Sequence, residues 1–526
     1  MSLTSIARLA FLRRQRQLEQ HYTAPIALQH NTLQHLLQRA RNTQYGVYYK
    51  FNEMLYSGQR MGYDQMYLDF WNNVPVNTYE ELKGYIDQMR HGAADILWPG
   101  TVKWYAKSSG TTNDKSKFIP VSKEGLDRIH YAGGTDVVVY YLQNNPKSRL
   151  FDGRALILGG SHAPNYNLPK SLVGDLSAIL IENINPLVNL VRVPDKKTAL
   201  ISDFEEKREK IARQCLNANV TNISGVPSWM MSVLMRVMEL SGKQHLQDVW
   251  PNLEVFFHGG IAFTPYRKAY EELITKSDMH YMETYNASEG FFGIQNDPTD
   301  PSMLLMLDYD VFYEFAPMDA VSDDGTISDP TRIVPLEGVE VGKNYAMLIS
   351  TSCGLWRYMI GDTVRFTSAM PYKFVITGRT KSFINAFGEE LIVDNAERGL
   401  QYACQETGAE ISEYTAAPVF RAAKDSDPKG MDEAPVPFHQ WLIEFKKEPA
   451  DLEHFADLLD AKLQELNSDY EAKRFKSINM IRLQIVKARP GLFNDWLKSK
   501  GKLGGQHKVP RLANTRQHIN ELLKMN

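Results

Sequence analysis

The stretch Lys107-Ser-Ser-Gly-Thr-Thr-Asn-Asp-Lys-Ser-Lys-Phe-Ile119 carries the strongest chemical signal in this chain of 526 residues. Gly110 permits a sharp turn, and successive backbone N–H groups in such a turn form a cavity that binds anions. Five side chains add hydroxyl donors or positive charge: Ser108, Ser109, Thr111, Thr112 and Lys117. The stretch predicts a polyphosphate-binding loop, although it lacks the G-x-x-x-x-G-K-[ST] spacing of a Walker loop. An ordinary polar turn is the alternative, because these residue types are common in turns.

The composition is that of a folded protein with more than one domain. The chain is 43% hydrophobic and carries a net charge of −3, so it has ample core and no sign of large-scale disorder. The near-neutral balance gives no signal for a nucleic-acid partner. Cys215, Cys353 and Cys404 lie too far apart for a disulfide framework or a zinc site. This use of cysteine favours a reducing, cytoplasmic setting.

The sequence also indicates that the protein does not span a membrane. No apolar run approaches the roughly 18 residues that a spanning helix needs. Ile6, Leu9, Ala10 and Leu12 have helical spacing among four arginines of the first 20 residues. We expect a helix packed on the domain, with a membrane-surface helix as the alternative. No feature points to an obligate protein partner.

The chain divides into stretches of different pattern. Residues 1 to about 100 are mostly helical, and a capping box at residues 78–81 opens a helix that runs to Met89. From residue 155 onward, short apolar runs at 155–158, 219–223 and 253–257 are each followed by glycine and then by a helical stretch. This alternation indicates an α/β fold.

The last 220 or so residues predict two further units. Residues 300–380 hold strand-like segments joined by turns, which predict a small β unit attached to the α/β core. Helical patterns over 393–406 and 451–466, with strand patterns near 414–421, 439–445 and 478–486, predict a compact α+β module. We therefore expect a large domain over residues 1–378 and a small domain over residues 379–526.

Four further segments fit the phosphate-loop candidate. In the segment Tyr285-Asn-Ala-Ser-Glu-Gly290, the tyrosine ring is suited to stacking on a purine, and the carboxylate of Glu289 is suited to binding Mg²⁺. The alternative is a strand-to-helix turn in which Glu289 is an acidic residue at the start of a helix. In residues 356–362, Asp362 follows glycine at a strand end and suits ribose hydroxyls, unless this is a common Gly-Asp turn.

The other two segments are basic. Thr377-Gly-Arg-Thr-Lys-Ser382 lies at the predicted domain boundary and is either a hinge with Arg379 facing a cleft or a polar linker. Lys502-Leu-Gly-Gly-Gln-His-Lys-Val-Pro-Arg511 is either a solvated charged face or a mobile loop that brings Lys508 to a phosphate.

In this order the five segments resemble the adenylate-forming superfamily of acyl-CoA synthetases, peptide-synthetase adenylation domains and luciferases. Within it, Tyr105-Ala-Lys-Ser-Ser-Gly-Thr-Thr112, Tyr358 with Gly361-Asp362, and Gln506-His-Lys-Val-Pro-Arg511 resemble the auxin-responsive Gretchen Hagen family of acyl acid–amido synthetases. The likeness covers about residues 20–515. It implies a large N-terminal α/β domain with a small β-barrel-like unit, and a small mobile α+β domain that carries the catalytic lysine.

The resemblance implies a role for each matching position. Ser108 to Thr112 and Lys117 would hold the ATP phosphates, Tyr285 the adenine, Glu289 the Mg²⁺, and Asp362 the ribose, with Arg379 close by. Lys508 would act at the α-phosphate. Acyl and adenine contacts would come from His258, Gly259, Gly260, Ile261, Pro227, Trp229, Met230 and Asn286. On residue type alone, a lone histidine such as His258 at a strand end is more often a hydrogen-bonded structural residue.

Two positions depart from the usual pattern of the plant members. Asn286 stands where they usually have glycine, which alters the wall of the nucleotide or acyl site. Met359 stands where they usually have arginine, which argues against a plant hormone as the acyl substrate.

The function that the resemblance implies is an ATP- and Mg²⁺-dependent ligase with a small carboxylic acid and an amino acid as substrates. The acid would be adenylated, and its acyl group would then pass to the amine. An acyl-CoA ligase with coenzyme A as the acceptor is an alternative, because its first half-reaction is the same. A non-catalytic nucleotide-binding regulator is a second alternative, against which the retained Glu289, Asp362 and Lys508 argue.

Overall fold

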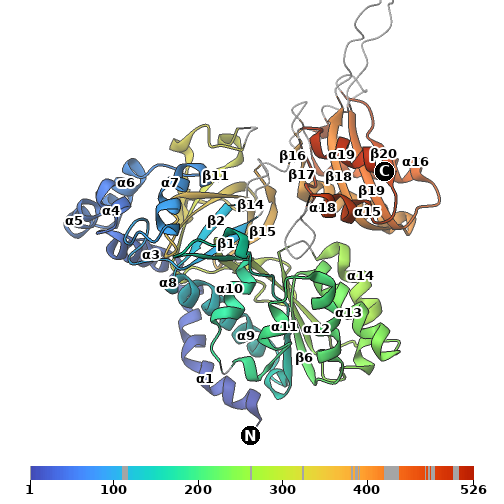
Figure 1. Ribbon diagram of the computed structural model, residues 1–526. Coiled ribbons are helices and arrows are strands. Elements are labelled where there is room, and N and C mark those ends of the chain that lie inside the picture. The colour runs from blue at the N-terminus through green and yellow to red at the C-terminus, as the bar shows by residue number, and fades with distance from the viewer. Residues whose placement is uncertain are drawn as a thin grey trace, which may run out of the picture.

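The computed structural model describes residues 2–108, 117–186, 188–260, 263–322, 325–380, 383–384, 389, 391–419, 438–467, 470–471, 474, 480–500, 509–513 and 515–526. Figure 1 shows a large N-terminal part and a smaller C-terminal part beside it, with the two chain ends far apart. The predicted domain boundary between residues 378 and 379 stays a prediction.

The helices of the first 145 residues are α1 (Leu3–Leu18), α2 (Gln20–Thr23), α3 (Pro25–Ala40), α4 (Gln44–Tyr48), α5 (Phe51–Met61), α6 (Tyr63–Asn73), α7 (Tyr79–Arg90), α8 (Lys123–Gly125), the π-helix η1 (Leu126–Tyr131) and α9 (Ala132–Asn144). The later helices are α10 (Leu176–Asn183), α11 (Lys196–Ala199), α12 (Phe204–Leu216), α13 (Pro227–Ser241), α14 (Thr264–Leu273), α15 (Val393–Thr407), α16 (Leu452–Leu466), α18 (Leu492–Ser499) and α19 (Gln517–Met525). The capping box predicted at the start of α7 is confirmed, because Glu81 accepts from the Thr78 backbone N–H at 2.7 Å.

The large sheet has twelve strands, in the spatial order β12 (Val334–Pro335), β11 (Val311–Pro317), β13 (Asn344–Thr351), β14 (Tyr358–Ala369), β15 (Tyr372–Arg379), β10 (Met303–Leu305), β9 (Gly290–Ile294), β8 (His280–Ala287), β7 (Val255–Gly259), β6 (Val220–Gly225), β3 (Arg154–Ile157) and β5 (Arg192–Val193). The strands from β5 to β8 pair in parallel, and the pairs from β8–β9 onward are antiparallel. The α/β prediction is therefore confirmed. The predicted β unit of residues 300–380 has no sheet of its own: its strands extend the α/β sheet, because β9 and β10 join the two halves.

Three smaller sheets complete the strand set. They are β2 (Lys117–Val121), β1 (Trp104–Ser108) and β4 (Leu172–Gly174) in one, β16 (Phe383–Ile384) and β17 (Leu391–Ile392) in another, and β18 (Glu410–Val419), β19 (Phe438–Lys447) and β20 (Gln484–Ala488) in the third. The last strand begins later than the predicted 478–486, and residues 475–479 lie outside the described part. The polar loop predicted at 425–437 also lies outside it.

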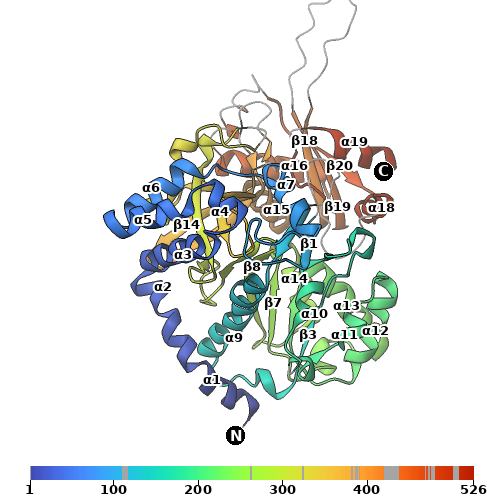
Figure 2. The same cartoon turned by 60° about the vertical axis from the view of Figure 1, so that its left-hand side comes forward.

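Each face of the parallel strands is covered by helices. Phe256 of β7 packs with α12, α13 and α14 in one core, whereas Phe257, the next residue, packs on the other face with α9 through Tyr141 at 5.5 Å. Figure 2 shows α9 beside β7. Successive side chains along a strand point to opposite faces of the sheet, and here both faces are covered by a core. Apolar residues are therefore expected on both faces of such a strand, which explains the continuous apolar runs in the sequence.

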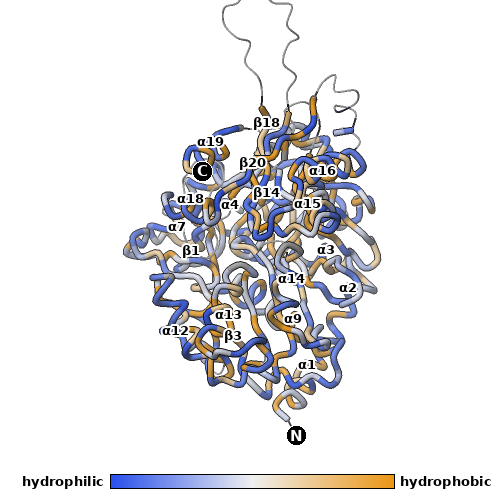
Figure 3. The backbone as a smooth tube through the Cα atoms, turned by 90° about the vertical axis from the view of Figure 1, so that its right-hand side faces the viewer, coloured by the Kyte–Doolittle hydropathy of each residue, from blue (hydrophilic) through white to orange (hydrophobic). Residues whose placement is uncertain are grey.

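The small C-terminal part follows the same rule. Trp441 of β19 packs with α15 and α16, and Leu442 beside it packs with α18 and α19. Hydrophobic and hydrophilic residues alternate along the helix tube of α15 in Figure 3, as expected for a helix with one face in a core. The predicted helix over 393–406 and the predicted α+β character are confirmed.

The N-terminal helix is packed on the large part, as predicted, through Thr4, Phe11 and Leu18 together with arginine contacts. Leu3, Ile6, Leu9 and Leu12 are 46–58% exposed. Arg8 instead donates to the carbonyl oxygen of Leu142 at the end of α9. Within the described residues, no helix is long and apolar enough to cross a membrane.

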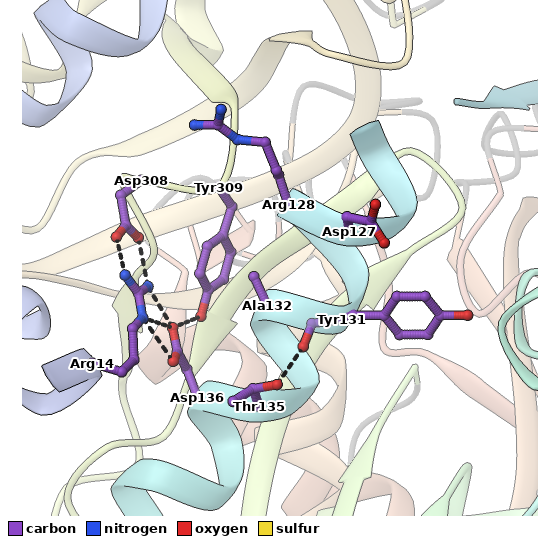
Figure 4. Close-up of a pocket in the computed structure, with 9 residues that line it drawn as sticks. All are labelled: Arg14, Asp127, Arg128, Tyr131, Ala132, Thr135, Asp136, Asp308 and Tyr309. Atoms are coloured by element: carbon purple, nitrogen blue, oxygen red, sulfur yellow. Dashed lines mark hydrogen bonds and ion pairs between the residues drawn. The ribbon is translucent and has the colours of Figure 1, made fainter. Parts of the chain in front are cut away.

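Arg14 is the main anchor of this helix (Figure 4). Its guanidinium lies 2.6 Å from a carboxylate oxygen of Asp136 on α9 and 2.6 Å from one of Asp308 before β11. Tyr309 donates to the same Asp136 carboxylate at 2.6 Å, and Asp136 is 1% exposed. The cavity of about 440 Å³ beside this cluster is also lined by Asp127, Arg128 and Tyr131, and it contains none of the predicted site residues. We therefore interpret the cluster as a structural anchor for α1.

Replacing Arg14 with methionine should lower stability. The change leaves the buried Asp136 carboxylate and Asp308 without their shared cation, which costs about 3 kcal/mol by comparison with other broken buried pairs. A thermal unfolding scan should show a midpoint lower by a few degrees. Arg13→Met is the matched control, because Arg13 is exposed on the same helix. Equal midpoints for the two variants would contradict the anchor role.

Candidate active site

The candidate site lies at the carboxyl ends of the parallel strands. Ligands bind at this edge in open α/β sheets, because loops and helix starts converge there. β6 ends at Gly225, β7 ends at Gly259, and β8 continues past both as far as Ala287 before the chain turns back into β9. The turn at residues 287–290 is thus a β-hairpin. The alternative of a strand-to-helix turn, with Glu289 as a helix-start acid, is wrong.

Three predicted residues from three strands meet in one hydrogen-bonded network. Tyr285 of β8 donates its hydroxyl to the carboxylate of Asp362 on β14. Arg379 lies opposite Asp362 in the β14–β15 register, and its Nε is 2.8 Å from the other carboxylate oxygen. Asp362 is inside β14 and not at a strand end as predicted, and Gly361 before it has φ of +88°, which favours glycine.

The Asp362 carboxylate shifts the pKa values of its two donors in the direction that keeps them protonated. Burial and the nearby Asp362 carboxylate raise the pKa of the Tyr285 hydroxyl well above its usual value, so it stays a donor. The Asp362 carboxylate raises the pKa of Arg379. A charged carboxylate held by one hydroxyl and one guanidinium is rigid and strongly polar, because charge-assisted hydrogen bonds are short and directional.

Glu289 and Lys117 stand next to this network. Glu289 is 7% exposed in the hairpin turn. Burial raises the pKa of its carboxyl group, Lys117 lowers it, and Asp362 raises it further. Lys117 begins β2, directly opposite Ser108 at the end of β1. The two ends of the predicted phosphate loop therefore lie close together, and the nearby Glu289 feels the charge of Lys117.

Several predicted residues lie outside the described part of the structure. They are Ser109, Gly110, Thr111, Thr112, Ile261 and Lys508. Among the described residues, no group of three or more His, Cys, Asp or Glu side chains is arranged to hold a metal ion. A single buried carboxylate such as Glu289 does fit Mg²⁺, which proteins usually hold through one or two carboxylates with substrate phosphates and water.

The end of β7 borders the network. Gly259 has no room for a side chain, since a Cβ there would lie 2.3 Å from the carbonyl oxygen of Thr284 on β8. His258 is 3% exposed, and its ring stacks on Phe263 at 4.1 Å. Burial lowers the pKa of His258 to about 3, so the ring is neutral at physiological pH. Gly260 follows with φ of +81°.

The predicted acyl-side residues occupy two different environments. On α13, Pro227 accepts a hydrogen bond from the Tyr270 hydroxyl at 2.8 Å, Trp229 is 8% exposed, and Met230 is fully buried in the helix–sheet core. Asn286 is in a different environment from the α13 residues, because its side chain lies beside His130 of η1. Burial lowers the pKa of His130 to about 4, and Asn286 partly opposes this shift.

Sequence reasoning missed two polar residues at this edge, Glu283 and His130. Glu283 lies two residues before Tyr285 on β8, directly opposite His258 of β7. The alternation of β8 would have placed it on the same face as Tyr285. His130 belongs to a π-helix, a rare element that occurs often at functional sites, and no local motif marks it.

The fold defines the class of protein. Over 97% of this chain and 94% of the other, the structure matches a solved structure of GH3.15 acyl acid amido synthetase with a TM-score of 0.72 at 17% identity. It matches 2-hydroxyisobutyryl-CoA ligase in the postadenylation state over 96% and 93% of the two chains, with a TM-score of 0.58 at 13% identity. The fold is that of the adenylate-forming enzymes, as the resemblance implied.

The chain belongs to the GH3 family. The family's N-terminal domain matches residues 14–279, its central domain residues 304–379 and its C-terminal domain residues 394–517. Relatives include indole-3-acetic acid-amido synthetase GH3.4 of Arabidopsis thaliana, 24% identical over 93% of this chain and 89% of the relative. GH3.8 of Oryza sativa subsp. indica is 24% identical over 84% and 82%. The resemblance stated from the motifs, and with it the class of amide-forming ligases, is confirmed.

The Asp362–Arg379 pair can be tested without any substrate. Arg379→Met should lower the thermal unfolding midpoint, because it leaves Asp362 and Glu289 as neighbouring carboxylates without that cation. Asp362→Asn should also lower the midpoint of the parent, yet it should raise the midpoint of the Arg379→Met variant by removing one of those carboxylates. This reversal of sign is the signature of coupled residues. Additive losses would contradict the geometry.

Proposed function

We propose that this chain is an ATP-dependent acyl acid–amido synthetase. It activates a small carboxylic acid with ATP and joins the acyl group to the amine of an amino acid. The observation that carries the proposal is the network of Tyr285, Asp362 and Arg379, with Glu289 and Lys117 beside it, at the carboxyl edge of the parallel strands in a GH3-family chain.

The chemistry explains why such a site needs fixed charges. A carboxylate resists nucleophiles, so the acid first attacks the α-phosphorus of ATP, which forms an acyl-adenylate and releases pyrophosphate. The amine then attacks the acyl carbon, and AMP leaves. Both steps develop negative charge on phosphate oxygens, and positioned cations and hydroxyl donors stabilise it without reorganising.

Each site residue has a proposed part in the first step. Tyr285 stacks on adenine, and Asp362 accepts from the ribose hydroxyls while Arg379 fixes its orientation. Ser108 to Thr112 hold the β- and γ-phosphates, with Lys117 at the end of the loop. Glu289 would hold Mg²⁺, which would supply positive charge beside the pyrophosphate group when bound. Acyl contacts come from Pro227, Trp229, Met230, His258, Ile261 and Asn286, and adenine contacts from Gly259 and Gly260.

The substrate class follows from the relatives. They are named for indole-3-acetic acid, and one matched structure is GH3.15 in complex with 2,4-DB. For this chain we propose a small carboxylic acid and an amino acid acceptor, and Met359 argues against a plant hormone as the acid. The predicted cytoplasmic setting is supported by three free cysteines.

Lys508 is the proposed catalytic cation of the small domain, which we place at residues 379–526. Lys508→Ala should reduce acid-dependent exchange of pyrophosphate into ATP by several hundredfold or more, because a few kcal/mol of charge stabilisation is lost at the α-phosphate. Lys500→Ala is the matched control: its ammonium pairs with Glu521 at 3.1 Å on the domain surface. Undiminished exchange in the Lys508 variant would contradict the assigned role.

The proposed function itself is tested by a screen of acids against acceptors. Aryl and alkyl carboxylic acids are supplied with ATP and Mg²⁺, and pyrophosphate release is measured. Each active acid is then offered either amino acids or coenzyme A. An amide product supports the proposal, a thioester supports the acyl-CoA ligase alternative, and failure to bind ATP in calorimetry supports the non-catalytic alternative.

The Mg²⁺ assignment predicts a shift in metal requirement. Glu289→Gln keeps the shape of the side chain but removes the charge that holds the cation. The Mg²⁺ concentration for half-maximal exchange should therefore rise about tenfold or more, the order of effect expected for one lost charge–charge contact worth about 1.4 kcal/mol. An unchanged Mg²⁺ dependence would place the metal elsewhere.

A further inference from the structure

Glu283 is a carboxylate that the adenylation step does not use. It lies on β8 at the same edge of the sheet, two residues before Tyr285 and opposite His258 of β7. Its backbone is fixed by Gln295 of β9, which donates to the Glu283 carbonyl oxygen at 2.9 Å and accepts from the Glu283 N–H at 3.1 Å. Among the described residues, no hydrogen bond or ion pair reaches its carboxylate, whereas Asp362 is held from two sides.

The groups that face Glu283 come from four elements. They are His258 of β7, Gln295 of β9, Arg267 of α14 and Glu397 of α15. Burial raises the pKa of Glu283 to about 7, Glu397 raises it further, and Arg267 opposes the shift. His258 is neutral, and its buried Nδ1 has no hydrogen-bond partner among the residues that the structure describes. A carboxylate in this setting exchanges a proton near neutral pH, as a general base must.

Glu283 lies where the two parts of the protein approach. Figure 1 shows α14 beside the small C-terminal part, and Lys268 of α14 pairs with Glu410 of β18 at 2.6 Å. The charge of Glu397 on α15 reaches Glu283 on one side and Arg511 on the other. The acyl-adenylate formed near Tyr285 and Asp362 would therefore lie close to Glu283, two residues before Tyr285 on the same strand.

The second half-reaction requires a base that the residues of the first do not supply. A free amino acid arrives with its amine protonated at neutral pH, and an ammonium has no lone pair for attack. Asp362 is committed to Tyr285 and Arg379, and Glu289 is proposed to hold the metal ion. His258 binds a proton too weakly at neutral pH to act as the base.

We propose that Glu283 takes the first proton from the acceptor amino acid, an inference that rests on the proposed function. The ammonium loses one proton to the Glu283 carboxylate, and the freed lone pair forms the new C–N bond. The bond from the acyl carbon to the phosphate oxygen breaks with its electron pair, so AMP leaves. The nitrogen releases its second proton to solvent, which completes a neutral amide.

Arg267 gives this site its selectivity for an α-amino acid. Its guanidinium lies over the rings of Phe263 at 5.0 Å and Tyr281 at 5.5 Å, and it acts on both Glu283 and His258. One carboxylate next to one guanidinium matches the ammonium and carboxylate of an amino acid, because arginine binds carboxylates through a planar fork. A simple amine satisfies half of this arrangement.

The experiment compares three reactions of the full-length Glu283→Gln protein. Pyrophosphate exchange reports adenylation, amide formation with an amino acid reports the complete reaction, and hydroxamate formation reports transfer to hydroxylamine, which is uncharged at neutral pH and needs no base. Amide formation should fall by about a hundredfold or more, the usual contribution of a general base. Exchange and hydroxamate formation should stay within a few-fold of the parent.

The pH profile supplies a second readout. In the parent, amide formation should rise with pH through about 7, because Glu283 must be deprotonated to accept a proton. The variant should lose this rise and retain only the one near the pKa of the amine. Glu205→Gln is the matched control, the same change on a side chain that is 69% exposed on α12.

Two results would overturn the inference. One is amide formation at the parental rate in Glu283→Gln, and the other is an equal loss of all three reactions, which would mark a structural role. If no acid supports exchange in the parent, the proposed function fails and this inference fails with it. That result is distinct from the first two, because it appears before any substitution is made.

Discussion

The carboxylate of Asp362 joins the two halves of the large sheet. It accepts the Tyr285 hydroxyl from β8, the last parallel strand, and it pairs with Arg379 inside the antiparallel half. The Tyr285 contact could not form if the β8–β9 hairpin did not turn the chain back into the same sheet, whereas Arg379 faces Asp362 across the β14–β15 pair. A buried polar network specifies its geometry because each unsatisfied member would cost free energy. The position of the candidate site therefore depends on this one carboxylate and on the hairpin that brings its partners together.

Three carboxyl groups at one edge of the sheet lie in different environments, and each environment favours a different chemical role. Asp362 is held by a hydroxyl and a guanidinium, which fix the position of its carboxylate. Glu289 lies near Lys117 and in a turn, where a cation can approach. Glu283 faces another carboxylate and a neutral histidine, and this environment disfavours its charged form. Carboxyl groups that lie in different environments commonly have different tasks, such as binding a substrate, holding a metal ion or transferring a proton.

The sequence predicted the parts of this protein that have local signals. The α7 capping box, the strand–glycine–helix repeats and the ordered motifs around Tyr285 and Asp362 all carry residue types that one chemistry requires. What it could not show depends on contacts far apart in the chain. Continuity of the sheet from β5 to β12 is set by the pairing of β9 with β10, and Arg14 anchors α1 through Asp136 and Asp308 while Leu3, Leu9 and Leu12 stay exposed. Glu283 has no motif of its own, and its chemistry comes from α14 and α15.

The contacts between the two parts of the chain suit a small domain that changes position. Lys268 with Glu410 and Arg365 with Asp394 join them, and these four side chains are 19–64% exposed. Exposed ion pairs of this kind contribute about 0–1 kcal/mol each, so breaking them costs little. The adenylation step needs the proposed lysine near the α-phosphate, and the amide-forming step needs room for an amino acid near Glu283. A small domain that moves between the two steps would meet both needs in turn.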